Sequence, residues 1–205
     1  MSVTLNRLDG LRFQRSYWDE RDIALWTLDC VLLGGKGIYA SSALTSGRRA
    51  QQLQREHGIP NNVSLRDHFD AERYELLLWN PNASAAVAFA AELHTRLGAT
   101  DVVISPAPFK ALGWPQEAYL DFWETLLRTR IKGVYFNDDW EYSNGCVYEF
   151  VVATEVGLET RDRAGITLSP DQGADRIVGA VRDLEAQGLD ASVISSHLER
   201  LTQGP

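Results

Sequence analysis

The sequence predicts an α/β fold, a Rossmann-like (flavodoxin-like) three-layer sandwich with a mostly parallel sheet. Short apolar runs alternate along the chain with longer helical segments, which is the pattern of a parallel sheet covered by helices on both faces. The length of 205 residues suits one domain. Hydrophobic residues make up 44% of the chain and charged residues 23%, so an ordinary globular core is expected.

Five segments are expected to form strands, because each is a short apolar run bounded by turn residues. They are residues 38–40, 74–79, 101–105, 133–136 and 166–168. In an open parallel sheet, ligands bind beyond the carboxyl ends of the strands. The loops after Tyr39, Ser105 and Phe136 are therefore where a site is expected.

Helices are expected between and after these strands. They are residues 48–57, 82–97, 118–130, 145–156, 174–187 and 191–201. Gly58 stops the first of them, and Ser143 or Asn144 is a candidate N-cap for the fourth. We expect residues 1–205 to form a single domain, with 1–30 as an N-terminal arm or short helix and 170–205 as C-terminal helices.

The composition argues against two kinds of partner. Acidic side chains outnumber basic ones by 28 to 20 and the net charge is -8, whereas a nucleic-acid polymer demands clustered Lys and Arg. No run of about 18 apolar residues predicts a membrane span, and the start of the chain lacks the apolar stretch of a signal peptide. Cys30 and Cys146 are interpreted as two reduced thiols of a cytoplasmic protein.

Several common site motifs are missing from the sequence. The glycine-rich residues 34–37 match neither the phosphate loop nor the dinucleotide fingerprint, so a plain turn is expected there. The four histidines lack metal-ligand spacing, and no nucleophile elbow is present. We therefore expect no metal and no cofactor.

The most informative stretch is residues 133–153. A predicted strand leads into an acidic, aromatic loop, then a Ser-Asn-Gly turn and a helix that carries Glu149 among apolar neighbours. A carboxylate in such a setting is unfavourable unless it is paired or functional. Two interpretations stay open: Glu149 pairs with an arginine such as Arg48, or it acts as a nucleophile toward a sugar carbon.

Two segments resemble the nucleoside 2-deoxyribosyltransferase-like family. Residues 134–149, VYFNDDWEYSNGCVYE, are similar to its site segment: an apolar strand, a loop, a small-residue turn with Gly, and Glu four residues after that Gly. Residues 38–48, IYASSALTSGR, resemble its first strand and loop, which end in Gly-Arg in nucleotide-using members. The matches occur in the family's order, and the resemblance spans about residues 37–168. It implies a homodimer or a higher homo-oligomer.

The resemblance also implies catalytic roles. Glu149 resembles the nucleophile that attacks C1′ of the sugar, and Tyr39 resembles the tyrosine that orients this carboxylate. The family usually has an Asp that acts on the leaving base; Glu124 stands at that position and Asp121 one turn earlier, and either is a candidate acid. Trp140 is interpreted either as stacking on the base or as packing against its own domain.

The position six residues before the nucleophile distinguishes substrates in this family. Nucleoside-using members tend to carry Asp there, whereas nucleotide-using members tend to carry Ser, as Ser143 does here. A hydroxyl can donate to a 5′-phosphate that a carboxylate would repel. The residues expected to contact substrate or phosphate are Ser42, Ser46, Gly47, Arg48, Ser143, Asn144, Gly145 and Trp140. The alternative for the Ser-rich loop is an ordinary polar turn.

These observations predict cleavage or transfer of the N-glycosidic bond of a (deoxy)nucleoside 5′-monophosphate through a Glu nucleophile. One alternative is a catalytically silent nucleotide-sensing module on the same fold. Another is a glycohydrolase of a nicotinamide dinucleotide. In each case the expected partner is a small nucleotide or nucleoside, not a nucleic-acid polymer or a membrane.

Overall fold

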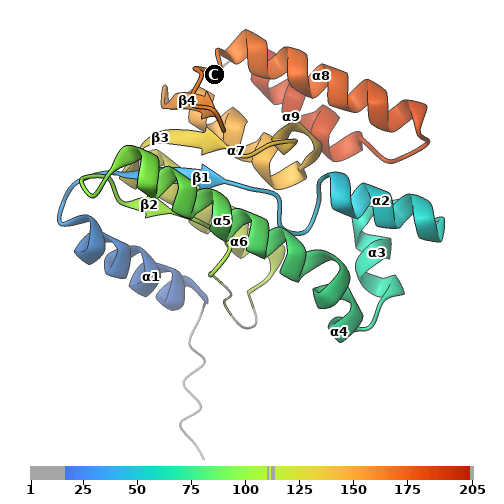
Figure 1. Cartoon of the computed structure of the whole chain (residues 1–205), viewed down its shortest axis with the longest axis horizontal. Helices are drawn as coiled ribbons and strands as arrows, with labels where there is room; N and C mark the ends of the chain where they lie inside the picture. The colour runs from blue at the N-terminus through green and yellow to red at the C-terminus, as the bar shows by residue number, and fades with distance from the viewer. Residues whose placement is uncertain (1–16, 110, 112–113, 204–205) are drawn as a thin grey trace, which may run out of the picture.

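The structure is a computed structural model that describes residues 17–109, 111 and 114–203. Within these residues, four strands form one sheet: β1 (Gly37–Ser41), β2 (Val103–Ile104), β3 (Ile131–Phe136) and β4 (Glu159–Asp162). Their order is β2-β1-β3-β4 and every neighbouring pair is parallel (Figure 1). The predicted α/β fold with a parallel sheet is confirmed.

The helices alternate with the strands and then continue to the end of the described chain. They are α1 (Tyr17–Leu32), α2 (Arg48–His57), α3 (Asn62–His68), α4 (Ala71–Tyr74), the π-helix η1 (Glu75–Trp79), α5 (Asn80–Leu97), α6 (Gln116–Arg130), the 3-10 helix η2 (Trp140–Tyr142), α7 (Asn144–Glu155), α8 (Pro170–Ala186) and α9 (Ser192–Gln203). The six predicted helices are present with their bounds shifted by at most a few residues. Gly58 ends α2 in a left-handed conformation, as predicted, with φ of 66°.

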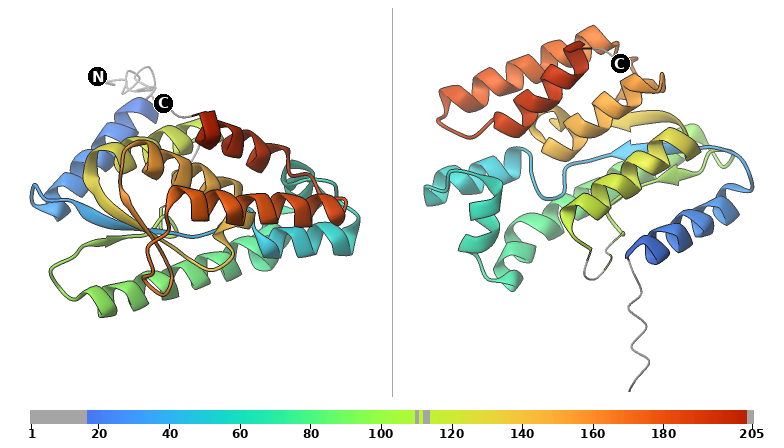
Figure 2. Two further views of the ribbon diagram at one scale, coloured as in Figure 1. Left: turned by 90° about the horizontal axis from the view of Figure 1, so that it is seen from above. Right: turned by 180° about the vertical axis from the view of Figure 1, so that it is seen from behind.

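The sheet is the middle layer of three. Helix α5 covers one face, and α1, α6, α7 and α9 cover the other (Figure 2). The side chains of β1 alternate between these layers, as a strand requires. Ile38 and Ala40 pack with Phe89 of α5, whereas Tyr39 lies in the cluster that α6 and α7 form on the opposite face.

The strand order creates a switch point between β1 and β3. The chain passes from β1 to β2 on one side and then returns to β3 on the other side of β1. In open α/β sheets, ligands bind in the crevice that forms beyond the strand ends at such a point. The carboxyl ends of β1 and β3 are joined there by a hydrogen bond from the Asn137 N–H to the Ser41 carbonyl, 3.0 Å.

Two predicted strands are wrong. Residues 74–79 are helical, since η1 continues from α4 directly into α5, and a short apolar run does not distinguish a buried strand from a helix. The last strand is β4, not residues 166–168, of which Thr167 makes only a single antiparallel bridge to Arg161. The β4 sequence Glu-Thr-Arg-Asp is charged because it is an edge strand, so apolar patterning does not reveal it.

The predicted N-terminal arm is in part a regular helix. Residues 1–16 lie outside the described residues, while α1 packs against α6. In the described part of the chain, no helix combines the length and apolar character needed to cross a membrane.

Candidate functional site

Glu149 projects from the second turn of α7 into the interior. The helix begins where the chain turns back from β3, and the Ser143 hydroxyl caps it by accepting from the Cys146 N–H. Most α7 residues around Glu149 are buried, among them Val147, Phe150 and Val151. The carboxylate is 8% exposed, so this acidic group is held within an apolar layer.

Both oxygens of the Glu149 carboxylate accept hydrogen bonds from β1. The Tyr39 hydroxyl donates to Oε1 over 2.7 Å, and the Ser41 hydroxyl donates to Oε2 over 2.6 Å. Residues two apart on a strand point to the same face, which is why these two side chains reach one carboxylate. The pairing of Tyr39 with Glu149 agrees with the sequence prediction. Ser41 was missed, although its position two residues after Tyr39 was a usable signal.

The surroundings of Glu149 act on its ionisation in opposite directions. Burial raises the pKa of Glu149 to about 7, while the hydrogen bonds from Ser41 and Tyr39 act to lower it. Burial and the neighbouring Glu149 also raise the pKa of Tyr39 well above its usual value, so Tyr39 stays protonated and remains a donor. The site therefore holds a carboxyl group that changes charge near neutral pH.

Two of the serines that are expected to contact phosphate, Ser46 and Ser143, lie together, and with Ser42 we call them the serine cluster. The hydroxyls of Ser46 and Ser143 share a hydrogen bond of 2.9 Å, and both residues are buried. Ser46 directly precedes Gly47, the N-cap of α2, and Ser143 is the N-cap of α7. The N-termini of two helices therefore meet at this hydrogen bond. The Ser42 hydroxyl is buried and has no hydrogen-bond partner in the described part of the chain.

Glycine is required at one position in this loop. Gly47 has φ of +89°, a conformation that L side chains rarely adopt, and a Cβ there would lie 3.0 Å from the Ala43 Cβ. At Gly145 a Cβ would meet nothing within 4 Å. Asn144 and Gly145 form the first turn of α7, where backbone N–H groups lack partners within the helix.

Arg48 does not pair with Glu149, so the predicted alternative of such an ion pair is wrong. The guanidinium lies over the Tyr142 ring, 3.4 Å from its centroid, and forms ion pairs with Asp183 at 2.8 Å and Asp139 at 3.6 Å. Two carboxylates therefore balance the positive charge of the Arg48 guanidinium, which the sequence analysis expects to bind a phosphate.

The two candidate acids on α6 have basic partners. Asp121 pairs with Arg21 of α1, and Glu124 pairs with Arg128 and accepts from the Tyr148 hydroxyl. Burial acts to raise the pKa of Glu124, but the hydrogen bonds from Tyr148 and Arg128 outweigh it and hold that pKa below its usual value. In this position Glu124 is held as a carboxylate.

Trp140 lies in the core, which corrects its predicted role in stacking on a base. The side chain is 1% exposed, and its ring packs between Phe136 and Phe150 at centroid distances of 4.8 Å each. Stacking on a ligand needs an open ring face, and these two rings leave none. The other interpretation, packing against its own domain, describes its position.

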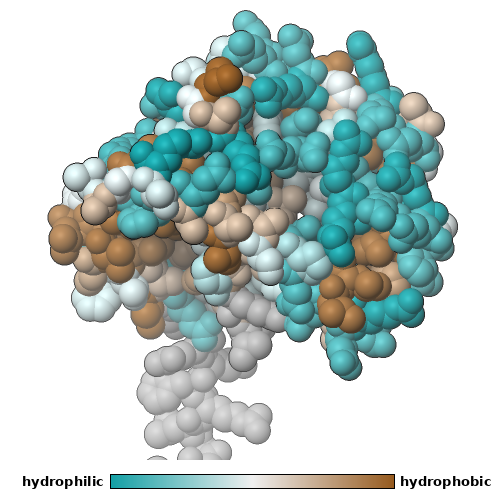
Figure 3. Space-filling view, viewed as in Figure 1, coloured by the Kyte–Doolittle hydropathy of each residue, from teal (hydrophilic) through white to brown (hydrophobic). Residues whose placement is uncertain are grey.

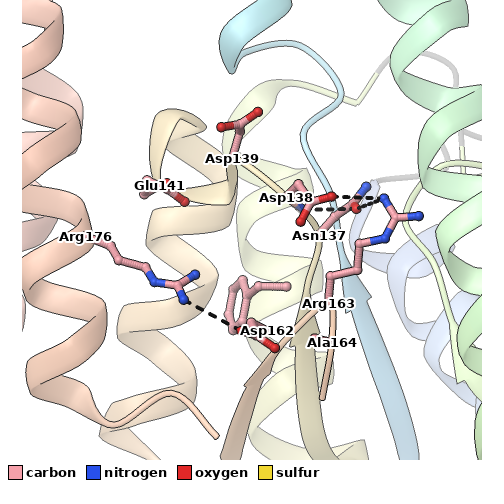
Figure 4. Close-up of a pocket in the computed structure, with 9 residues that line it drawn as sticks. Asn137, Asp138, Asp139, Glu141, Asp162, Arg163, Ala164 and Arg176 are labelled. Atoms are coloured by element: carbon pink, nitrogen blue, oxygen red, sulfur yellow. Dashed lines mark hydrogen bonds and ion pairs between the residues drawn. The ribbon is translucent and has the colours of Figure 1, made fainter. Parts of the chain in front are cut away.

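A polar cavity of about 310 Å³ opens beyond the carboxyl ends of β3 and β4. It is lined by Phe136, Asn137, Asp138, Asp139, Glu141, Asp162, Arg163, Ala164 and Arg176. Figure 4 shows Arg176 of α8 facing Asp162, and Arg163 facing Asn137 and Asp138. The loop after Phe136, where the sequence analysis expects a site, forms one wall of this cavity. The wall formed by the end of β4 and the loop that follows it was not expected, because β4 itself was missed.

The described residues contain no group of three or more His, Cys, Asp or Glu side chains placed to hold a metal ion. Burial raises the pKa of the Cys146 thiol to about 12, so this cysteine is not a nucleophile at neutral pH.

Comparison with protein-family models, with curated proteins and with solved structures finds no match for the chain.

Proposed function

We propose that this protein cleaves or transfers the N-glycosidic bond of a (deoxy)nucleoside 5′-monophosphate, with the Glu149 carboxylate as the nucleophile. The observation that supports this most directly is the pair of hydrogen bonds by which Tyr39 and Ser41 hold the two oxygens of Glu149. A carboxylate fixed in this way, near the switch point of the sheet, can be aimed at an electrophilic carbon.

The proposed reaction is a double displacement. An oxygen of Glu149 forms a bond to C1′ as the bond from C1′ to the base nitrogen breaks, and the electron pair leaves with the base. Water or a second base then attacks C1′ and releases Glu149. In this proposal Glu124 or Asp121 first separates from its arginine partner and takes up a proton. It then donates that proton to the departing base and takes one back from the water that attacks C1′.

The serine cluster supports a phosphate as part of the substrate. Ser42 and Ser46 supply hydroxyls, and the N-termini of α2 and α7 meet beside Ser143. Hydroxyls, free backbone N–H groups and helix dipoles together favour an anion. Arg48 would add charge if a phosphate competed with Asp183 for its guanidinium.

Release of free base from a panel of nucleosides and nucleoside 5′-monophosphates tests the proposal. We expect base from at least one monophosphate with the unchanged protein and none with Glu149→Gln. Glu117→Gln is the matched control, because Glu117 is exposed in the first turn of α6. The proposal fails if no base is released, or if Glu149→Gln releases it as fast as the control.

One observation favours a second function, nucleotide binding without turnover. Glu149 is 8% exposed and both of its oxygens already accept hydrogen bonds, so attack on C1′ requires one of them to be released. Calorimetry with the same monophosphates separates the two functions. A binding module would give binding heat with a monophosphate and release no free base from it. It would also release no nicotinamide from a nicotinamide dinucleotide.

A further inference from the structure

Helix α1 is apolar on two opposite sides. Leu25 and Leu32 face the protein core, with exposed fractions of 5% and 7%. On the other side, Trp26 is 68% exposed and Leu33 at the end of the helix is 90% exposed. Large apolar side chains that gather on one side of a helix are characteristic of a side that packs against another surface. Among the residues that the structure describes, only the first of these two sides is covered.

Ion pairs fix which side of α1 faces outward. Asp29 accepts hydrogen bonds from Nε and Nη2 of Arg130, at 2.7 and 2.8 Å, near the end of the helix. Arg21 pairs with Asp121 near its start. Because both links join α1 to α6, the helix cannot rotate about its axis to bury its outer side without breaking them.

The outer side forms a continuous uncharged surface, which we call the outer face of α1. It consists of Ile23, Trp26, Thr27, Cys30, Val31 and Leu33. Figure 3 shows apolar residues gathered at the position of α1, at the left of the molecule. Three of these residues, at positions 23, 26 and 30, follow the three-four spacing by which two helices pack along a shared seam, and Leu33 directly follows the helix.

Charge at the two ends of this face identifies its partner. The exposed Asp22 precedes the face, and the exposed Lys36 follows it in the turn after the helix. The one charged side chain between them, Asp29, is 46% exposed, but its charge is paired with Arg130. If a second copy of α1 lies antiparallel against the first, Asp22 meets Lys36 of the partner subunit at both ends of the pair. A parallel pair would instead place like charges together. Two-fold symmetry forms both contacts from one surface.

We infer that the outer face of α1 is a self-association surface, on which a second copy of this chain docks its own α1 in the antiparallel direction. The complementary ends and the helix-pairing spacing favour this occupant over an unrelated protein. The inference does not depend on the proposed enzymatic activity, since neither Glu149 nor the serine cluster belongs to this face.

Light scattering during gel filtration, at several protein concentrations, tests the surface. We expect twice the chain mass for the unchanged protein and the single chain mass for Trp26→Glu. The matched control is Val63→Glu, because Val63 is 74% exposed on α3 and outside the outer face. Circular dichroism checks that both variants are folded. A monomeric unchanged protein, or a dimeric Trp26→Glu variant, overturns the inference and leaves the face to another segment or a different protein.

Charge exchange tests the direction of docking. Asp22→Lys and Lys36→Asp should each weaken the dimer, and the double variant should restore it. If the double variant is weaker than either single variant, the antiparallel arrangement is wrong.

Cys30 provides an independent measurement in the unchanged chain. Cys30 is exposed on the outer face, whereas Cys146, the other cysteine, is buried. An antiparallel pair of outer faces, each running from Ile23 to Leu33, is centred near position 28, so the two Cys30 positions are offset along the helix axis by roughly one helical turn. A short bis-maleimide should therefore join two chains, and Cys30→Ser should prevent this. Absence of a cross-linked dimer contradicts the arrangement.

Discussion

The Tyr39 hydroxyl donates to Oε1 of Glu149 over 2.7 Å, and so joins the central strand β1 to a helix residue 110 positions later in the chain. The Tyr39 ring also contacts the partly buried Trp123 of α6, with ring centroids 5.7 Å apart. Three secondary-structure elements thus determine where one carboxylate lies.

Replacement of Tyr39 by Phe should raise the pKa of Glu149 further above its value of about 7. The variant keeps the burial that raises this pKa but loses one donor that lowers it. We expect a rise of roughly one unit, since a lost hydrogen bond to a charged group is worth about 1.5–3 kcal/mol and Ser41 remains as a donor. Titration of carboxyl-labelled protein by ¹³C NMR measures it, with the Glu149→Gln spectrum assigning the signal.

Tyr135→Phe is the control for this substitution. Tyr135 lies on β3 and belongs to the cluster on the α5 face, so its hydroxyl is not near Glu149. An unchanged Glu149 titration in Tyr39→Phe would show that Tyr39 does not stabilise the ionised form.

Glu149 should make the protein less stable as the pH rises from about 4.5 to about 7. The folded-state pKa is raised above the usual 4.5, so in this interval the folded chain binds more protons than the unfolded chain, and stability falls with pH. Across this interval, the pKa shift of Glu149 lowers the free energy of unfolding by about 3 kcal/mol. Urea unfolding of Glu149→Gln and of the unchanged protein at pH 5 and pH 8 measures this term. The variant should gain stability relative to the unchanged protein at pH 8, and an equal difference at both pH values would refute the prediction.

Local sequence patterns predicted the parts of the site that depend on short stretches of chain. Glu149 stands out as a carboxylate among apolar residues near a helix start, and Ser143 because a hydroxyl at that position caps α7. The parallel sheet determines where a strand end and a helix start meet. The alternation of strands and helices in the sequence predicts that sheet. The contact between Tyr39 and Glu149 itself was predicted from the resemblance of residues 38–48 and 134–149 to a known family.

The parts that failed depend on contacts between distant segments. Arg48 pairs with Asp183, which lies 135 positions away on α8. No sequence pattern near either residue predicts this ion pair. Trp140 looks like an exposed loop residue in sequence, but η2 turns it inward against Phe136 and Phe150. In both cases the type of residue was evident from the sequence, whereas the residues that it contacts were not.

Replacement of Asp183 by Asn should strengthen binding of a nucleoside 5′-monophosphate. It removes one of the two carboxylates that balance Arg48, so the guanidinium becomes more available to a phosphate. Because the Arg48 side chain is 43% exposed, we expect a modest gain of about 2- to 5-fold in affinity. Binding of the corresponding nucleoside should not change.

Calorimetry with the monophosphate and the nucleoside measures both affinities. Asp175→Asn is the control, because Asp175 is exposed on the same helix and carries the same charge. Equal gains in the two variants would attribute the effect to net charge and not to Arg48.

Two glycines of α8 should respond in opposite ways to replacement by Ala. At Gly173 a Cβ would lie 2.0 Å from Cζ of the fully buried Phe150, so Gly173→Ala must displace a core ring between α7 and α8. Such overpacking costs about 1–3 kcal/mol or more. At Gly179 a Cβ would meet nothing within 4 Å, so Gly179→Ala should stabilise the helix by about 1 kcal/mol. Urea unfolding midpoints measure both changes. Since the two substitutions are chemically identical and share one helix, a Gly173→Ala variant as stable as Gly179→Ala would show that Phe150 does not pack against α8 in solution.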